Sequence, residues 1–240
     1  MKRIRNSVLV ALVIIGFNGC FTAPTYPVVP QIEYASIYYG KATVGQDSIV
    51  LEINFKDGDG DLGLDDTFNS DTTFYPEVRY YGFNGKQVTY KTKRQNPQLN
   101  LPDFVTPFNC INWEVLRDKK TNIVIDTLYT KYNPNYYTIF VDFLIKDAQG
   151  NFKKFDPTTY FIYPNCSIAG YNGRFPVLSK EPGKKSPLDG KIRYSLRSLG
   201  FDATFGIKTL KLIVTIQDRA LNRSNTIETP PFSLQQILCK

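Results

Sequence analysis

The sequence predicts an all-β protein with an immunoglobulin-like β-sandwich, either one sandwich with a long insertion or two modules. The 240 residues include 17 Phe and 16 Tyr, and aromatic residues favour strands. Short runs that alternate apolar and polar residues recur along the chain, separated by turn-forming Gly, Pro, Asn and Asp. Blocks of helix-favouring Ala, Glu and Leu are absent from the sequence, which points the same way.

Residues 1–19 have the pattern of an export signal. A basic start precedes the apolar run 7–17, which is too short to span a membrane, and Gly19 and Cys20 follow. The basic residues of this start are Lys2, Arg3 and Arg5. A small residue before a cysteine resembles a bacterial lipoprotein lipobox, which implies cleavage before Cys20 and acyl chains on that residue. An ordinary secretory signal with an incidental cysteine is the alternative.

Residues 20–31 are predicted to be the lipidated cysteine and a Pro-rich tether. Three prolines between Cys20 and Gln31 favour an extended chain, which at about 3 Å per residue holds the body roughly 30 Å from the bilayer. We therefore expect a protein anchored in the outer membrane through Cys20. No acidic cluster follows Cys20. This favours the periplasmic face, with the cell surface as the alternative.

The body is predicted to divide into a first β-sandwich region at 32–130 and a second at 131–240. A strand ending in aspartate recurs at Asp57, Asp147 and Asp218, at spacings close to the size of an immunoglobulin-like module. Turn aspartates at strand ends are common enough to explain this recurrence without a repeat. The predicted hairpin turns are Asn84-Gly85 and 147–151, and the predicted long loop is 94–107. The predicted strands are 32–39, 48–55, 111–116, 123–130, 137–145, 152–155, 160–163, 190–196, 210–216 and a broken stretch at 226–237.

An acidic loop follows the alternating run 49–55 and carries the strongest chemical signal. Its aspartates alternate with glycines, an arrangement that suits a hard cation held by oxygen ligands. The predicted calcium ligands are Asp57, Asp59 and Asp61, with Asp65 and Asp66 completing the shell. The loop resembles the first half of an EF-hand, but Leu62 and Phe68 occupy its sixth and twelfth positions. We therefore expect a strand-to-loop calcium site, with an ion-free Gly/Asp turn as the alternative.

The acidic loop and the leader together resemble a family. The segment Phe-Lys-Asp-Gly-Asp-Gly-Asp-Leu-Gly at 55–63, after a Pro-rich lipoprotein leader, is similar to Bacteroidota outer-membrane lipoproteins with immunoglobulin- or cadherin-like sandwiches. The closing segment 214–225 resembles the last hairpin of such domains. The resemblance implies an envelope location and a sandwich fold. Some members are accessory subunits of outer-membrane assembly, secretion or uptake complexes, which implies a protein partner in the envelope.

Composition excludes several kinds of chemistry. The sequence has no histidine, which removes Ser-His-Asp and Cys-His catalysis and histidine zinc sites. The net charge is +7, and without the leader 26 basic residues face 22 acidic ones. This small excess is scattered and accompanies no recognition motif, so we expect no nucleic-acid binding. Among the remaining cysteines, Cys110–Cys166 is the preferred disulfide with Cys239 free, and three reduced cysteines are the alternative.

The function expected from the sequence is that of a non-enzymatic, lipid-anchored subunit that binds an envelope protein. The alternative is a carbohydrate-binding lipoprotein of a glycan-uptake system, because the chain is rich in tyrosines that could form a platform. A hydrolase with paired carboxylates is a third hypothesis, and Glu52, Glu114 and Asp142 are its possible members. No spacing singles out a pair among these three.

Overall fold

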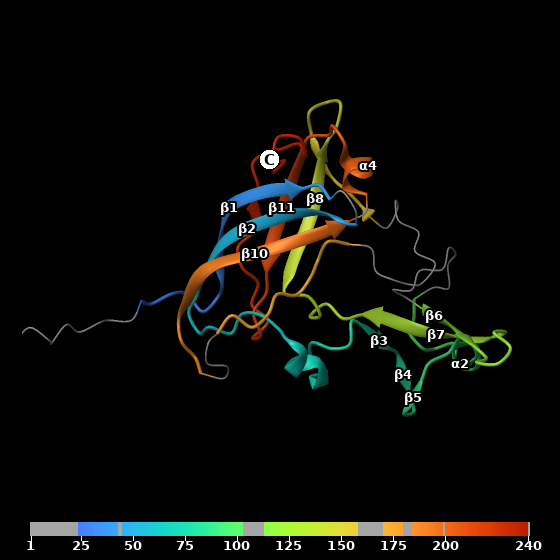
Figure 1. Ribbon diagram of the computed structural model, residues 1–240. Helices are drawn as coiled ribbons and strands as arrows, with labels where there is room; N and C mark the ends of the chain where they lie inside the picture. The colour runs from blue at the N-terminus through green and yellow to red at the C-terminus, as the bar shows by residue number, and fades with distance from the viewer. Residues whose placement is uncertain are drawn as a thin grey trace, which may run out of the picture.

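The structure is a computed structural model whose elements are shown in Figure 1. It describes residues 24–42, 45–102, 113–157, 170–179, 184–198 and 200–239. The predicted signal peptide 1–19, the lipidation site Cys20 and the predicted disulfide Cys110–Cys166 lie outside these ranges. Within them, no helix has both the length and the apolar character needed to cross a membrane.

Two antiparallel sheets form the body of the molecule. In Figure 1, the strands of the first sheet cross over those of the second. The first sheet has the order β1 (Gln31–Gly40), β2 (Asp47–Asp57) and β10 (Leu188–Ser198). The second sheet has the order β12 (Ile227–Glu228), β11 (Leu210–Ile216), β8 (Ile139–Lys146) and β9 (Phe152–Lys154). The predicted all-β, sandwich-type fold is confirmed.

One hydrophobic core lies between the two sheets. Alternate residues of β2 and β11 point inward, as the period of two in a strand requires, and these inward residues are fully buried. They are Ile49, Leu51 and Ile53 on β2, and Leu210, Leu212, Val214 and Ile216 on β11. All of these side chains belong to a single cluster. The short helix α4 (Phe201–Phe205) adds two buried rings to it.

The sheets do not follow the predicted division at residue 130. Strand β10, from the predicted second region, pairs with β2 of the predicted first region along its whole length, from Leu188↔Asp57 to Ser198↔Asp47. Of the two arrangements left open by the sequence, the structure shows one sandwich with an insertion. We define the insertion as residues 78–132, which lie between β2 and β8.

The insertion forms a small sheet of its own. Its strand order is β3 (Val78–Tyr80), β7 (Val124–Tyr132) and β6 (Trp113–Arg117). The predicted hairpin turn joins β4 (Gly82–Phe83) to β5 (Lys86–Gln87). Asn84 and Gly85 both have positive φ, at 49° and 74°, as a tight two-residue hairpin turn of the primed type demands.

Two short helices occur where the sequence indicated polar loops. Helix α2 (Tyr90–Gln95) overlaps the start of the predicted loop 94–107, because the Thr89 side chain accepts a hydrogen bond from the Thr92 backbone N–H at 3.2 Å. The 3₁₀ helix η1 (Asp66–Ser70) follows the acidic loop and also begins at a side-chain N-cap, that of Asp65. Neither helix has a buried residue, so neither shows the apolar periodicity that would reveal it in the sequence.

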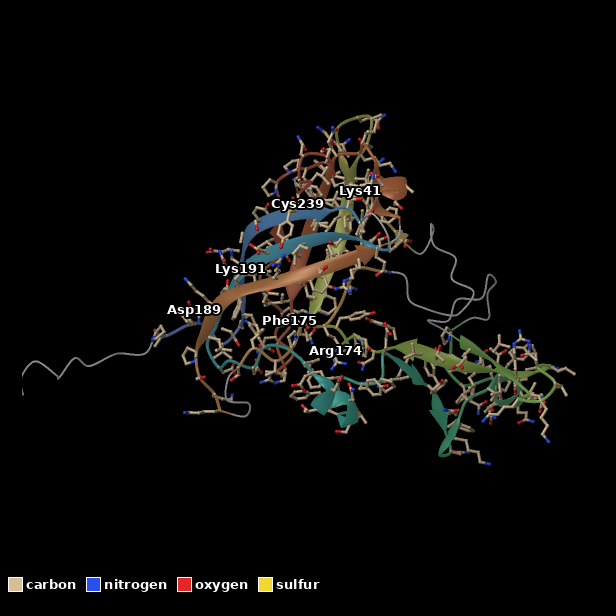
Figure 2. The ribbon with its side chains drawn as sticks, in the orientation of Figure 1. Lys41, Arg174, Phe175, Asp189, Lys191 and Cys239 are labelled. Atoms are coloured by element: carbon tan, nitrogen blue, oxygen red, sulfur yellow. The ribbon has the colours of Figure 1, made fainter. Side chains whose placement is uncertain are left out.

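Hydrogen bonds and a cation–π contact among the residues that flank the insertion close its base. The Asn133 backbone N–H donates to the Glu77 carbonyl at 2.8 Å, and the Asn133 side chain donates to the Pro76 carbonyl at 3.1 Å. Figure 2 shows Arg174 between the sandwich and the start of the insertion. Its guanidinium lies 5.2 Å from the centre of the Tyr136 ring. The insertion is therefore held at its base, while β6 and α2 lie far from the sandwich (Figure 1).

Candidate metal centre

The acidic loop begins where β2 ends. Burial alternates along the end of β2, so Asp57 points inward and is fully buried. Asp59 is 7% exposed, and Asp61 is half-buried. One carboxylate oxygen of each aspartate lies within 4.8 Å of the corresponding oxygens of the other two. The structure therefore brings the three central predicted ligands together.

The glycines of the loop allow two other backbone segments to approach closely. A Cβ on Gly58 would lie 2.4 Å from the Tyr26 carbonyl oxygen, in the tether. A Cβ on Gly60, whose φ is +71°, would lie 2.2 Å from the Ser186 carbonyl oxygen, just before β10. The alternation of Asp with Gly thus fits a loop that is packed on both sides and turns its acidic side chains to one point.

Each of the three carboxylates uses one oxygen in a hydrogen bond and leaves the other without a donor. The Oδ2 atoms accept from the Asp61 backbone N–H, the Lys185 Nζ and the Ala220 backbone N–H, at 3.1, 3.3 and 2.9 Å for Asp57, Asp59 and Asp61. The Oδ1 atoms of all three are buried, and no donor among the described residues reaches them. A buried charged oxygen without a partner is costly, so a loop with three of them forms a group that could hold a cation.

The pKa values of Asp57 and Asp61 reflect the crowding of buried carboxylates in the loop. The pKa of Asp57 is raised to about 7, first by burial and then by repulsion from the carboxylates of Asp61, Asp59 and Asp218. Burial, followed by repulsion from Asp218 and Asp59, also raises the pKa of Asp61. A bound cation would reverse both shifts, because it favours the ionised form of each carboxylate.

Asp65 and Asp66 are not part of this group, contrary to their prediction as ligands. Asp65 is the N-cap of η1, and its Oδ1 accepts from the Thr67 backbone N–H at 3.0 Å. The exposed Asp66 accepts a hydrogen bond from the Asn69 side chain at 3.3 Å. The chain has already turned into the helix at these positions, so their carboxylates serve the helix instead of the loop.

Asp218 is a fourth carboxylate beside the loop that the sequence did not assign to it. Its backbone forms a bridge with Leu62, and its buried carboxylate contributes to the raised pKa of Asp57 and Asp61. Asp218 accepts from the Asn222 backbone N–H at 2.7 Å and from the Asn222 side chain at 2.8 Å, so its carboxylate also closes the turn after β11.

Three distant chain segments meet at the acidic loop. The Gly58 N–H donates to the Pro27 carbonyl at 2.8 Å, and the Ser186 N–H donates to the Asp59 carbonyl at 3.3 Å. The Arg219 N–H donates to the Asp61 carbonyl at 3.2 Å. The loop thus contacts the tether, the segment entering β10 and the turn after β11. Because of these hydrogen bonds, the conformation of the loop is coupled to the junction between the tether and the sandwich.

The donor set fits a hard divalent cation. Asp57, Asp59 and Asp61 offer only carboxylate oxygens, which suit calcium, magnesium or manganese better than the softer metals that prefer nitrogen or sulfur. Two described cations lie near the loop. The largely exposed Lys185 ammonium pairs with the Oδ2 of Asp59, and the charge of Arg219 lowers the pKa of Asp61. Neither donates a hydrogen bond to the three Oδ1 atoms.

The carboxylates considered for a hydrolase do not converge. Glu52 on β2 accepts from the Ser36 hydroxyl at 2.8 Å and from Lys191 Nζ at 3.1 Å. Glu114 on β6 accepts from the Tyr80 hydroxyl at 2.6 Å, and Asp142 on β8 pairs with a lysine of β9. Each carboxylate therefore has a separate local partner. Cys239 is exposed and not disulfide-bonded.

Comparison of the chain with protein-family models, with curated proteins and with solved structures gives no match.

Proposed function

We propose that this chain is a non-enzymatic outer-membrane lipoprotein whose β-sandwich binds an envelope protein and is fixed to its tether by one calcium ion. The observation that carries the calcium site is the set of three buried Oδ1 atoms of Asp57, Asp59 and Asp61 that lack a hydrogen-bond donor. The anchor and the partner are supported by the leader and lipobox at Cys20 and by the resemblance to accessory lipoproteins.

Calcium is the proposed ion because of the number of clustered charges and their setting. Calcium accepts several carboxylates and backbone carbonyls in a flexible shell, whereas magnesium retains several waters and binds few protein ligands. Three carboxylates within 4.8 Å of one another suit calcium better than magnesium. An exported protein also meets an environment in which modules with calcium dissociation constants of about 10⁻⁴ to 10⁻³ M are filled.

The burial of the site supports a structural role for the ion. Asp57 is fully buried and Asp59 nearly so, with backbone packed against the loop at Gly58 and Gly60. This packing leaves no room for a substrate to reach the carboxylates. A bound ion would neutralise the carboxylates and hold the surrounding segments together. We infer that calcium stiffens the point where the tether leaves the sandwich.

Hydrogen–deuterium exchange tests this role. Calcium added to chelator-treated protein should slow exchange of the amides of Gly58, Ser186 and Arg219, because their hydrogen bonds connect the loop to the three converging segments. Exchange in the β6–β7 hairpin should stay unchanged, which makes that hairpin an internal reference. Equal exchange at the three amides with and without calcium would rule out the proposed clasp.

Cell fractionation tests the anchor and the partner. We expect the wild-type chain in the outer-membrane fraction and the Cys20→Ala variant in the soluble fraction, because acyl chains on Cys20 would supply the membrane affinity. Wild-type protein purified from detergent-solubilised membranes should bring a stoichiometric envelope protein with it. Membrane association of Cys20→Ala equal to that of the wild type after a high-salt wash, which removes electrostatic attachment, would contradict the lipid anchor. Recovery of the chain alone would contradict the partner.

A further inference from the structure

The tip of the β6–β7 hairpin exposes a group of aliphatic side chains. We define the hairpin tip as residues 116–125. Its exposed aliphatic residues are Leu116, Ile123, Val124 and Ile125, at 38%, 66%, 50% and 47% exposure. Because Ile123, Val124 and Ile125 are consecutive and each is about half exposed or more, both faces of the hairpin present apolar surface to solvent. The tip lies in the part of the insertion that is far from the sandwich (Figure 1).

The tip is an ordered turn. The Asp118 N–H donates to the Ile123 carbonyl, and the Asn122 N–H donates to the Asp118 carbonyl, both at 2.9 Å. The Asp118 carboxylate accepts from the backbone N–H groups of Lys120 and Thr121 at 2.9 and 2.8 Å. The one acidic residue of the tip is therefore used within the turn, and the aliphatic side chains are presented by a fixed backbone.

Positive charge surrounds these aliphatic residues. The exposed Arg117, Lys119 and Lys120 belong to the tip itself. Helix α2 packs beside β7 and carries three more cations, with the Lys91 N–H lying 3.4 Å from the Asp126 carboxylate of β7. The insertion has nine basic and four acidic residues, whereas the rest of the chain from Cys20 onward has 17 basic and 18 acidic. The excess positive charge of the body is thus concentrated in the insertion.

We propose that the hairpin tip inserts into the interface of an anionic phospholipid membrane. Aliphatic residues exposed on all sides of a convex tip can be covered by acyl chains, while flat or concave protein surfaces cover one side. The flanking lysines and arginine would remain at the level of the headgroup phosphates, where basic residues are attracted to anionic lipid. This contact goes beyond the proposed function, since it requires neither acylation of Cys20 nor the calcium loop.

Vesicle co-sedimentation tests the proposal. The probe is the unlipidated Cys20→Ala chain starting at residue 20, mixed with vesicles of pure phosphatidylcholine or of equal parts phosphatidylglycerol and phosphatidylcholine. We expect a partition coefficient about tenfold or more higher on the anionic vesicles, because several cations of the tip contribute. Increasing salt should reduce this difference, as screening requires.

Two tip variants and a control separate the electrostatic contribution of the lysines from the apolar contribution of the aliphatic side chains. Lys119→Glu/Lys120→Glu should remove the preference for anionic vesicles, and Ile123→Ser/Val124→Ser should lower binding about tenfold by removing apolar contact. The control is Ile207→Ser/Lys208→Glu, which makes one change of each kind at exposed positions of the sandwich, where Ile207 is 98% exposed.

The outcomes either support or overturn the proposal. Binding that is lost in both tip variants and kept in the control supports it. No binding to either vesicle, or equal binding by the parent chain and both tip variants, overturns it and leaves an acidic protein surface as the partner of the tip. Unchanged melting temperatures of the variants, expected for exposed positions, show that the fold is intact. These outcomes are independent of the calcium experiments and of acylation, because the purified probe has no acyl chains.

Discussion

Calcium at a concentration about one hundred times its dissociation constant should raise the melting temperature of the chelator-treated protein by about 5–10 °C. A ligand that binds only the folded state at this excess adds about 2.7 kcal/mol, and 1 kcal/mol shifts a domain of this size by about 2–4 °C. The physical source is the relief of the three buried, mutually repelling carboxylates of the acidic loop. Differential scanning calorimetry measures the shift.

The variant Asp57→Asn should abolish this response. It should also raise the melting temperature of the calcium-free protein, because the amide keeps the shape of the side chain and removes a fully buried charge. The matched control is Asp65→Asn, which preserves a good N-cap of η1 and should respond to calcium as the wild type does. A wild-type response in Asp57→Asn, or a lost response in Asp65→Asn, would show that the ion binds elsewhere.

The pH dependence of the calcium-free protein provides a second check on the same site. The pKa of Asp57 is raised to about 7 in the folded state, above its value of about 4 in the unfolded chain. The folded state therefore binds more protons between these values, and its free energy of unfolding should fall as pH rises from about 4 to about 7. Saturating calcium should reduce this fall, because the ion stabilises the ionised carboxylate.

Local spacing determined how much of the acidic loop could be predicted. Asp57, Asp59 and Asp61 follow a strand with glycines between them, and that local pattern places their oxygens together. Asp65 was assigned to the same shell through its closeness in sequence, although a threonine two residues later makes it a helix cap. Asp218 reaches the loop through a bridge to Leu62, and no local pattern could identify a neighbour that distant in the chain.

The strands of the fold could likewise be predicted from local sequence patterns, whereas their long-range pairing could not. The alternation of β11 is visible in the sequence, and the predicted range 210–216 matches the observed strand. The pairing of β2 with β10 is not visible, because 130 residues of chain with their own sheet lie between them. The recurrence of strand-end aspartates at module-sized spacings therefore favours two modules as readily as one sandwich with an insertion.

Phe143→Ala should lower the free energy of unfolding by about 3–5 kcal/mol, the range for large-to-small changes at buried aromatic residues. Phe143 is 1% exposed on β8, and its ring stacks on Phe205 of α4 at a centroid distance of 4.7 Å. Its ring centre also lies 4.5 Å from that of Tyr171. Removal of the ring would leave a cavity bordered by three separate segments, so little collapse is expected. Chemical denaturation followed by circular dichroism measures the loss.

The way in which this variant unfolds distinguishes one sandwich from two modules. Strands of both sheets contribute to the cluster that contains Phe143, so its loss should shift the transition of the whole sandwich as one unit. Ile123→Ala, at a 66% exposed position of the insertion, should change the free energy of unfolding by less than about 0.5 kcal/mol. If Phe143→Ala split the transition and left β1 and β2 at their wild-type midpoint, the shared core would be contradicted. A single shifted transition would mean that the acidic loop at the end of β2 and the strands β8 and β11 are stabilised together.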